Sequence, residues 1–222
     1  MPHESLHSQV YLYPLAEALV RADESPPVPE QNPETMKPIV PIVLKSERLI
    51  LRPPLPEDAP HVECFVSDRR VAEMTALIPH PYPRGGALDW IHLSERQWLE
   101  GVKATFAICL RDSGELVGCA SYFNDSERDN EIGYWIGVPH WGRGYATEAL
   151  TRLLRYVFED LGGGRVDTYH FAHNPASGRV MEKAGMKFVS KTPLGASRDG
   201  VAYDDVRYSI SAEEWASRYS LR

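Results

Sequence analysis

Cysteine is scarce in this sequence, and long apolar runs are missing. The 222 residues contain three cysteines, Cys64, Cys109 and Cys119, and no pair of them has the CxxC spacing typical of zinc and redox sites. No apolar run approaches the about 20 residues that a helix needs to cross a bilayer. We therefore expect reduced, buried thiols, with no disulfide framework, no metal site and no membrane segment.

Basic residues are also in short supply. Lys and Arg number 24 against 31 Asp and Glu, which gives a net charge of −7 at pH 7. The first twenty residues hold no Lys or Arg and so lack the basic start of a secretory signal, and we expect a soluble, cytoplasmic protein. Nucleic acid is normally bound by a basic face, so no nucleic-acid partner is expected, and a cationic partner fits the charge better.

The length and the proline distribution indicate one domain with an extension. A chain of 222 residues is long enough for one well-packed domain but short for two. Near its start lies a stretch that can form a short helix, 9–21, followed by SPPVPEQNPETMKP, whose five prolines and acidic residues are typical of an extended linker. We assign 1–39 to an N-terminal extension and 40–222 to a single domain.

In the first half of the domain, apolar periodicity and turn residues predict one strand, two helices and three further strands. The predicted elements are a strand at 42–52, helices at 56–67 and 86–101, and strands at 103–111, 115–123 and 129–138. Short polar segments separate the last three strands, which favours an antiparallel meander.

After the meander, apolar residues recur at steps of three and four, which predicts a helix from about 146 to the glycines at 162–164. The remaining predicted elements are a strand at 166–174, a helix at 175–186, and strands at 187–191 and 201–211. This order predicts a mixed α/β (α+β) fold with helices packed on a central sheet.

The stretch WGRGYATEAL, 141–150, places two glycines and an arginine directly before that long helix. The first amides of a helix have no partner within it, and glycine lets a ligand approach the backbone closely. Together with the helix dipole and the Arg143 side chain, the amides of Gly142 to Thr147 could surround an anion such as a pyrophosphate. The plainer alternative is that Gly142 and Gly144 only shape a turn.

Two other phosphate-binding loops are disfavoured. A Walker loop ends in Gly-Lys-Ser/Thr, which does not occur here. The spacing Gly142-x-Gly144-x-x-Thr147 is close to the dinucleotide fingerprint, but Thr147 replaces the third small residue, and an antiparallel meander precedes the helix instead of a βαβ unit. A nucleoside-triphosphate hydrolase and a nicotinamide enzyme are therefore not expected.

Three stretches together resemble a known family. EIGYWIGVPHWGRGYATEALTRLLRYVFEDLG and the later FAHNPASGRVMEKAGMKFV are similar to the acetyl-CoA-binding half of the GNAT superfamily of N-acetyltransferases, most of all its RimJ/RimL-like type. SERLILRPPLPEDA, 46–59, is similar to the opening of that type, so the resemblance covers about 45–210 and leaves the extension unexplained. The wider superfamily has Gln or Arg where this sequence has Trp141, whereas the RimJ/RimL type commonly has Trp there.

The resemblance implies a GNAT fold: a central, mostly antiparallel sheet of six or seven strands, helices on both faces, and a splayed strand pair that holds acetyl-CoA. The pantetheine arm would then bind backbone groups of Ile136, Gly137 and Val138. The residues implied for the pyrophosphate are Arg143, Gly144, Tyr145, Ala146 and Thr147. Asn174 would contact the cofactor, cap its own helix, or do both. No metal is implied.

Acetyl transfer to an amine needs a base, because an amine with a pKa of about 10 is mostly protonated at neutral pH. Glu131 matches a family glutamate that acts directly or through water; otherwise it is a solvated charge at a strand end. The leaving thiolate needs a proton, and the tyrosine that much of the superfamily uses is replaced here by Met181. Ser177, one turn earlier, matches the serine of the RimL type and is the expected acid, although NPAS at 174–177 is also a good helix start.

The leading interpretation is an acetyl-CoA-dependent N-acetyltransferase that acts on a primary amine, either a protein N-terminus or a small molecule. The alternatives are a non-catalytic acyl-CoA-binding or sensing module and an interaction protein whose proline-rich extension docks partners. A homodimer stays open. His170 and His173 alternate with aromatic residues on a predicted strand, and we expect both to be structural.

Overall fold

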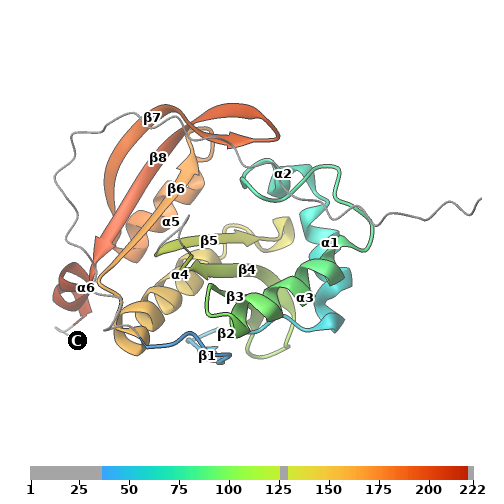
Figure 1. The fold of residues 1–222 in the computed structure, drawn as a ribbon, viewed down its shortest axis with the longest axis horizontal. Coiled ribbons are helices and arrows are strands. Elements are labelled where there is room, and N and C mark those ends of the chain that lie inside the picture. The colour runs from blue at the N-terminus through green and yellow to red at the C-terminus, as the bar shows by residue number, and fades with distance from the viewer. Residues whose placement is uncertain (1–36, 126–129, 220–222) are drawn as a thin grey trace, which may run out of the picture. The chain divides into compact units, whose positions relative to one another are not determined.

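The computed structural model describes residues 37–125 and 130–219 (Figure 1). The helix expected at 9–21 and most of the expected linker lie outside the described residues. The Lys37 amide donates to the Leu161 carbonyl oxygen at 2.9 Å, and Ile39 is 6% exposed within the core. Packing of the domain therefore includes the last residues that we assigned to the extension.

An eight-stranded sheet forms the centre of the fold (Figure 1). In the order in which they lie side by side, the strands are β1 (Leu44–Lys45), β2 (Leu49–Arg52), β3 (Lys103–Leu110), β4 (Leu116–Phe123), β5 (Glu131–Ile136), β6 (Arg165–Phe171), β8 (Val201–Ser211) and β7 (Lys187–Arg198). All neighbours are antiparallel except β5 and β6, which are parallel. The predicted meander is confirmed as β3, β4 and β5, and the mixed fold class is confirmed with it.

The number of strands corrects the prediction of six or seven. The single strand expected at 42–52 is two antiparallel strands, β1 and β2, with Leu44 opposite Leu51. Ser46 closes the turn between them, because its amide donates to the Leu49 carbonyl oxygen at 3.0 Å and its hydroxyl accepts from the Leu49 amide at 3.2 Å. A serine that satisfies nearby backbone groups in this way competes with a continuous strand.

The C-terminal hairpin also differs from the prediction. β7 runs to Arg198, well beyond the strand expected at 187–191, and pairs with β8 through two irregular steps, one of them between Thr192 and Ala196. Pro193 and Gly195 lie within that step, and such residues interrupt the alternation from which the strand was predicted.

The helices are α1 (Ala59–Val66), which follows the 3₁₀ turn η1 (Pro56–Asp58), α2 (Arg69–Ala72), α3 (Gly86–Leu99), the short turn η2 (Val138–His140), α4 (Tyr145–Arg155), which continues into the π-helical segment η3 (Tyr156–Leu161), α5 (Pro175–Ala184) and α6 (Ala212–Tyr219). The helices predicted at 56–67, 86–101 and 175–186 are confirmed. α2 and α6 were not predicted; the four residues of α2 are too few to show a helical period.

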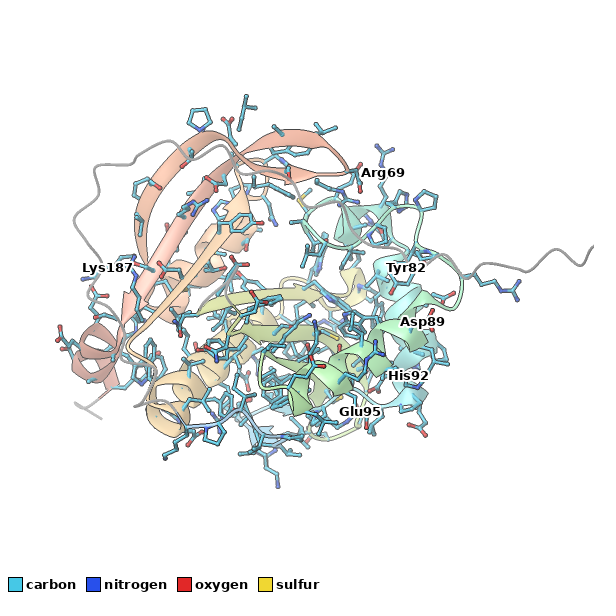
Figure 2. All side chains as sticks on the ribbon, in the orientation of Figure 1. Arg69, Tyr82, Asp89, His92, Glu95 and Lys187 are labelled. Atoms are coloured by element: carbon cyan, nitrogen blue, oxygen red, sulfur yellow. The ribbon has the colours of Figure 1, made fainter. Side chains whose placement is uncertain are left out.

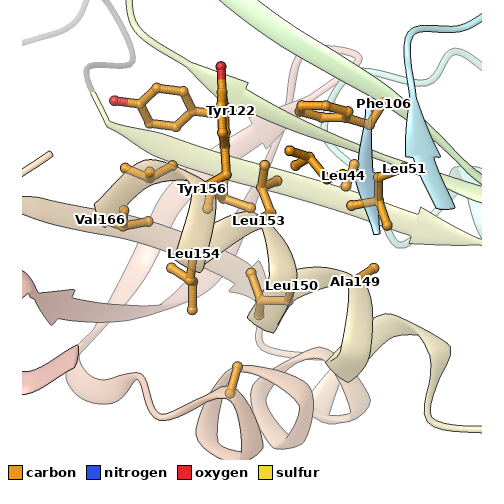
Figure 3. Close-up of a cluster of buried hydrophobic side chains, with 14 of the residues drawn as sticks. Leu44, Leu51, Phe106, Tyr122, Ala149, Leu150, Leu153, Leu154, Tyr156 and Val166 are labelled. Atoms are coloured by element: carbon orange, nitrogen blue, oxygen red, sulfur yellow. The ribbon is translucent and has the colours of Figure 1, made fainter. Parts of the chain in front are cut away.

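Both faces of the sheet carry helices. Leu150 and Leu153 of α4 pack with Phe106 in the larger core cluster on one face (Figure 3), while Val62 of α1 packs with Cys119 in a second cluster on the other. Burial of each such aliphatic side chain contributes roughly 1.5–3 kcal/mol relative to exposure. α1 and the first half of α3 pack in the second cluster and α4 and α5 in the larger one, while Trp98 near the end of α3 packs against Phe106 in the larger cluster.

Helix α3 has one buried and one exposed side. Ile91 is 2% exposed and Ser94 is fully buried, whereas Asp89, His92 and Glu95 point away from the sheet (Figure 2). This alternation at steps of three and four is the pattern that predicted the helix.

Candidate functional site

Strands β5 and β6 run parallel but separate after one pair. Glu131 lies opposite Asp167, and the Thr168 hydroxyl donates to the Ile132 carbonyl oxygen at 2.6 Å. Beyond this point the two described strands have no further paired residues, and they diverge in Figure 1. The inner edge of β5 after Ile132 is therefore not used by β6.

Backbone groups along β5 point alternately to its two neighbours. The Gly137 amide, just after β5, donates to the Val117 carbonyl oxygen of β4 at 2.9 Å. Odd-numbered residues of this strand therefore direct their amides and carbonyls to β4, and the even-numbered Tyr134 and Ile136 direct theirs toward the diverging β6. An extended ligand could pair with this edge as an additional strand does.

The turn after β5 uses several of the backbone groups expected to hold the pantetheine arm. The Trp141 indole donates to the Ile136 carbonyl oxygen at 2.6 Å, and the Gly137 carbonyl oxygen accepts from the His140 amide at 2.9 Å. Gly137 thus has both its backbone groups engaged within the protein. Among the three expected residues, the amides of Ile136 and Val138 take part in none of these bonds and are the better placed donors.

The glycine loop has the backbone conformation that an anion site needs. Gly142 and Gly144 have φ angles of 74° and 81°, in the left-handed region that favours glycine. Gly144 directly precedes α4 and has no side chain that could cap the first amides of the helix, which have no partner within it. The exposed Arg143 side chain lies between the two glycines. Amides, dipole and guanidinium therefore suit a pyrophosphate.

A distant turn holds this loop in place. Arg48, in the turn before β2, pairs with Glu148 of α4, its Nε lying 2.7 Å from Oε2, and its Nη1 donates to the Arg143 carbonyl oxygen at 3.0 Å. Burial alone would raise the pKa of Glu148, but bonds from the Arg48 amide, the Ser46 hydroxyl and the Arg48 guanidinium outweigh it and lower that pKa. Neither Arg48 nor Glu148 was predicted as a site residue, since no local motif joins two positions 100 residues apart.

Ser177 lies in the first turn of α5, where the sequence placed it. The Asn174 side chain accepts from the Ser177 amide at 3.4 Å, so Asn174 occupies the cap position of this helix. The Ser177 hydroxyl is 2.8 Å from the Tyr134 hydroxyl, and the Tyr134 hydroxyl also lies 3.2 Å from the Ser177 carbonyl oxygen. The expected acid is thus joined to a tyrosine of β5.

Tyr134 was not predicted as a site residue. Burial raises the pKa of its hydroxyl well above the usual range, and the bond with Ser177 offsets this only in part. The hydroxyl therefore stays protonated at neutral pH and can act as a hydrogen donor. A polar tip within an apolar strand was the available signal, but such tyrosines are more often structural.

Glu131 begins β5 at the end where β5 and β6 still pair. Its side chain shares a face of the strand with Trp135, which packs in the cluster of α1 and α3, and lies on the face opposite Tyr134. Three residues of strand span about 10 Å between Glu131 and Tyr134. The structure therefore places the expected base, Glu131, on the face of β5 opposite Tyr134, the residue to which the expected acid Ser177 is hydrogen-bonded.

The two histidines considered above lie outside this arrangement. His170 is 7% exposed, its Nδ1 is 2.8 Å from the Phe171 carbonyl oxygen, and its ring packs against Tyr208. His173 stacks on Phe171 with ring centroids 5.4 Å apart. His170 therefore has the packed surroundings expected of a structural histidine, whereas His173 is exposed.

Other kinds of site find little support. In the described part of the chain, no group of three or more His, Cys, Asp and Glu could hold a metal ion. The helices within 37–125 and 130–219 include none with the length and apolar character of a membrane span.

An open groove of about 610 Å³ lies between α1 and the start of α3 and contains none of the predicted site residues. It is lined by Ala59, Pro60, Glu63, Cys64, Ser67, Arg84, Gly85 and Leu88.

One splayed parallel pair in an otherwise antiparallel sheet, followed by a glycine loop and a helix, defines the GNAT class of acetyltransferase folds. The chain belongs to this family, since the model of the acetyltransferase (GNAT) domain matches residues 48–187. It is accordingly an N-acetyltransferase that uses acetyl-CoA, as the resemblance implied.

Individual relatives agree with this assignment. Uncharacterized N-acetyltransferase p20 of Bacillus licheniformis is 34% identical over 176 residues, which are 78% of this chain and 98% of that protein. The ribosomal protein uS5-alanine N-acetyltransferase of Escherichia coli is 25% identical over 78% of this chain and 92% of its own length. The structure of Mycobacterium smegmatis RimJ in complex with CoA-disulfide has a TM-score of 0.71 at 23% identity and covers 81% of this chain and 91% of that one.

Proposed function

We propose that this acetyltransferase transfers the acetyl group of acetyl-CoA directly to a primary amine. The observation that carries the proposal is the Tyr134–Ser177 hydroxyl pair beside the inner edge of β5. Pantetheine bound along that edge, by the amides of Ile136 and Val138, would bring its thioester to this pair. The pyrophosphate would bind the loop of Arg143, Gly144, Tyr145, Ala146 and Thr147, with Asn174 near it.

In this scheme Glu131 accepts the proton that the amine loses, and Ser177 donates a proton to the departing sulfur. The neutral amine nitrogen bonds to the acyl carbon and then releases one proton to Glu131, the carbon–sulfur bond breaks, and the sulfur takes a proton from Ser177, so CoA leaves as a thiol. Water returns a proton to Ser177, and an acceptor that arrives as an ammonium ion first loses one further proton to water. Glu131 and Tyr134 lie on opposite faces of β5 and about 10 Å apart along it, so in this scheme Glu131 does not contact the hydroxyl pair and takes the proton through water.

The hydroxyl pair supports Ser177 as the proton donor to the sulfur, with Tyr134 orienting it. If the Tyr134 hydroxyl donates to Ser177 Oγ, the hydrogen of Ser177 is left to point at the sulfur. The raised pKa of Tyr134 keeps its hydrogen in place, so it orients Ser177 and is not itself consumed.

Two classes of acceptor fit this chain. The Escherichia coli relative acts on an alanine of ribosomal protein uS5, and by analogy a protein N-terminus is one acceptor of this chain. Small amines are the other, because the net charge of −7 favours an approaching cation.

The test is acetyl transfer by the purified protein to a panel of N-terminal peptides and small primary amines, followed by mass spectrometry. An increase of one acetyl group on an amine nitrogen, lost in Glu131→Gln, is the expected result. Acetyl-CoA binding without acetylation of any amine would overturn the proposed reaction. An acetylated cysteine trapped on the enzyme would replace direct transfer with a covalent route.

A further inference from the structure

Arg48 and Glu148 join two segments that lie far apart in the sequence. The Glu148 carboxylate accepts three bonds from one turn: from the Ser46 hydroxyl at 2.8 Å, the Arg48 amide at 2.7 Å and the Arg48 Nε at 2.7 Å. The Glu148 side chain is 16% exposed and that of Arg48 is 46% exposed, so the carboxylate is the shielded half of the pair. A charge-assisted set of this kind is stronger than an exposed ion pair.

The far end of the Arg48 side chain lies against the glycine loop. Its Nη1 donates to the Arg143 carbonyl oxygen at 3.0 Å, and its guanidinium carbon is 4.9 Å from the centre of the Tyr145 ring. A Cβ added to Gly144 would come within 3.3 Å of Arg48 Nη2. Arg48 therefore contacts three consecutive residues of the loop while Glu148 holds its other end.

We propose that the Arg48–Glu148 pair is a latch that holds the glycine loop in the conformation that binds the pyrophosphate of acetyl-CoA. The inference rests on the proposed function, because it requires that the loop hold the pyrophosphate. Arg48 is a positioning residue in this scheme: it acts through the loop backbone.

The physical reason is the freedom of the loop itself. Two glycines within three residues leave the backbone many conformations when it is not tethered, and a ligand that had to select one of them would bind more weakly. The bond to the Arg143 carbonyl oxygen also turns that oxygen toward Arg48. A carbonyl oxygen held there is kept from repelling the phosphates.

Glu148→Gln distinguishes the effect of the latch on CoA binding from the effect of a negative charge near the anionic ligand. Removing a negative charge close to an anionic ligand would by itself tighten binding. The latch requires the opposite, because glutamine presents an N–H group to Arg48 Nε and loosens the pair. We expect the dissociation constant for CoA, measured by calorimetry, to rise about tenfold, the change that one charge-assisted contact carries. Unchanged or tighter binding would overturn the latch.

Arg48→Met should act through the pyrophosphate alone. Its kcat/KM for acetyl-CoA should fall about tenfold, whereas its kcat/KM for S-acetylpantetheine, which has no pyrophosphate, should stay that of the parent with the same amine. An equal loss with both substrates would indicate a general structural defect and would overturn the proposal. Arg48→Lys keeps a bond to Glu148 but not the fork that reaches Arg143, so it should recover part of the preference for acetyl-CoA.

Arg111→Met is the matched control. Arg111 Nη1 donates to the carbonyl oxygens of Ser46 and Glu47 at 3.0 and 3.1 Å, so it supports the same turn without contacting the loop. This variant should keep the parent's preference for acetyl-CoA, and a loss as large as in Arg48→Met would assign the effect to the turn and overturn the latch.

The parent enzyme distinguishes failure of the proposed binding mode from failure of the latch. If it uses S-acetylpantetheine as well as acetyl-CoA, the loop holds no pyrophosphate, and the proposed binding mode fails together with the latch. If it prefers acetyl-CoA and Arg48→Met keeps that preference, the latch alone is wrong.

Discussion

The Tyr134 hydroxyl of β5 lies 2.8 Å from the Ser177 hydroxyl of α5, so one hydrogen bond joins strand β5 to the first turn of helix α5. Neither residue can change its position without affecting the other. The bond makes Tyr134 part of the candidate site, although only Ser177 was predicted from the sequence.

Ser177→Ala and Tyr134→Phe should each lower kcat about tenfold, roughly the contribution of one hydrogen bond to a developing charge. The double variant should lose little more than the larger single loss, because the two hydroxyls act as a unit. Tyr208→Phe is the control. The Tyr208 hydroxyl, on β8, donates to Glu182 of α5 at 3.0 Å and does not contact Tyr134 or Ser177. Full activity in Tyr134→Phe would show that Tyr134 does not orient Ser177 for catalysis.

Glu131→Gln should lower kcat by about 10² to 10⁴, the usual range for a general base, and leave the affinity for CoA unchanged in calorimetry. Glutamine keeps the size of the side chain and removes its basicity. Asp167→Asn is a close control, because Asp167 lies opposite Glu131 but is bonded to Arg165 at 2.9 Å. A smaller loss of kcat in Glu131→Gln than in Asp167→Asn would show that Glu131 is not the base.

The same kinetics bear on a covalent alternative. Burial raises the pKa of the Cys119 thiol well above its usual value, and burial also raises the pKa of Cys109. A protonated thiol is a poor nucleophile, so replacing either by Ala should leave the chemical step intact.

Arg143→Ala should weaken CoA binding by about 1–3 kcal/mol, the range for loss of a charge-assisted contact. Gly144→Val should weaken it more, because a branched side chain is strained at φ 81° and would displace Arg48. Gly114→Val carries the same backbone strain at φ 75° in an exposed turn and should bind CoA like the parent. Calorimetry that finds parental affinity in both loop variants would rule out the loop as the pyrophosphate site.

The stability of the fold should depend on pH through Asp58. Arg52 donates two bonds to Asp58, at 2.7 and 2.8 Å, and the Leu55 amide donates a third at 2.8 Å. Burial would raise the pKa of Asp58, but these bonds outweigh it and lower that pKa. Stability from this carboxylate is therefore present above its unfolded pKa and is lost as the pH falls through the lower, folded pKa.

Asp58→Asn should accordingly cost about 1–3 kcal/mol at pH 7, because it leaves a half-buried Arg52 without its partner. Urea unfolding between pH 7 and pH 3 should show a smaller loss of stability in this variant than in the parent. Glu73→Gln removes an exposed pair with Arg69 and should follow the parent curve. If the free energy of unfolding falls with pH equally in Asp58→Asn and in the parent, Asp58 is not the source of the pH dependence.

Deletion of residues 1–36 should leave a folded domain that binds acetyl-CoA. The proline-rich part of this segment, 25–36, offers little apolar surface to pack. Lys37 and Ile39 must be kept, since both contact the domain. A shorter chain that starts at residue 40, and so lacks Lys37 and Ile39, is the informative comparison and should be less stable. Loss of CoA binding in the shorter deletion would make the extension part of the functional domain.

Local patterns in the sequence were enough to determine much of the fold. The apolar steps of three and four that predicted α4, and the alternation that predicted β3, β4 and β5, depend only on which side chains face a core. The glycine loop could be predicted as well, because Gly142 and Gly144 and the first amides of a helix have the same properties in any fold. The split of 42–52 into β1 and β2 could not, since it depends on bonds between Ser46 and Leu49.

Tertiary structure alone decided which residues meet. Arg48 and Glu148 have no shared pattern in the sequence, and their pairing follows from packing of α4 against the β1–β2 turn. Tyr134 reaches Ser177 only because β5 and β6 diverge and leave the inner edge of β5 beside α5. Periodicity records which face of an element is buried, whereas the partner of a polar side chain is set by how distant elements are brought together.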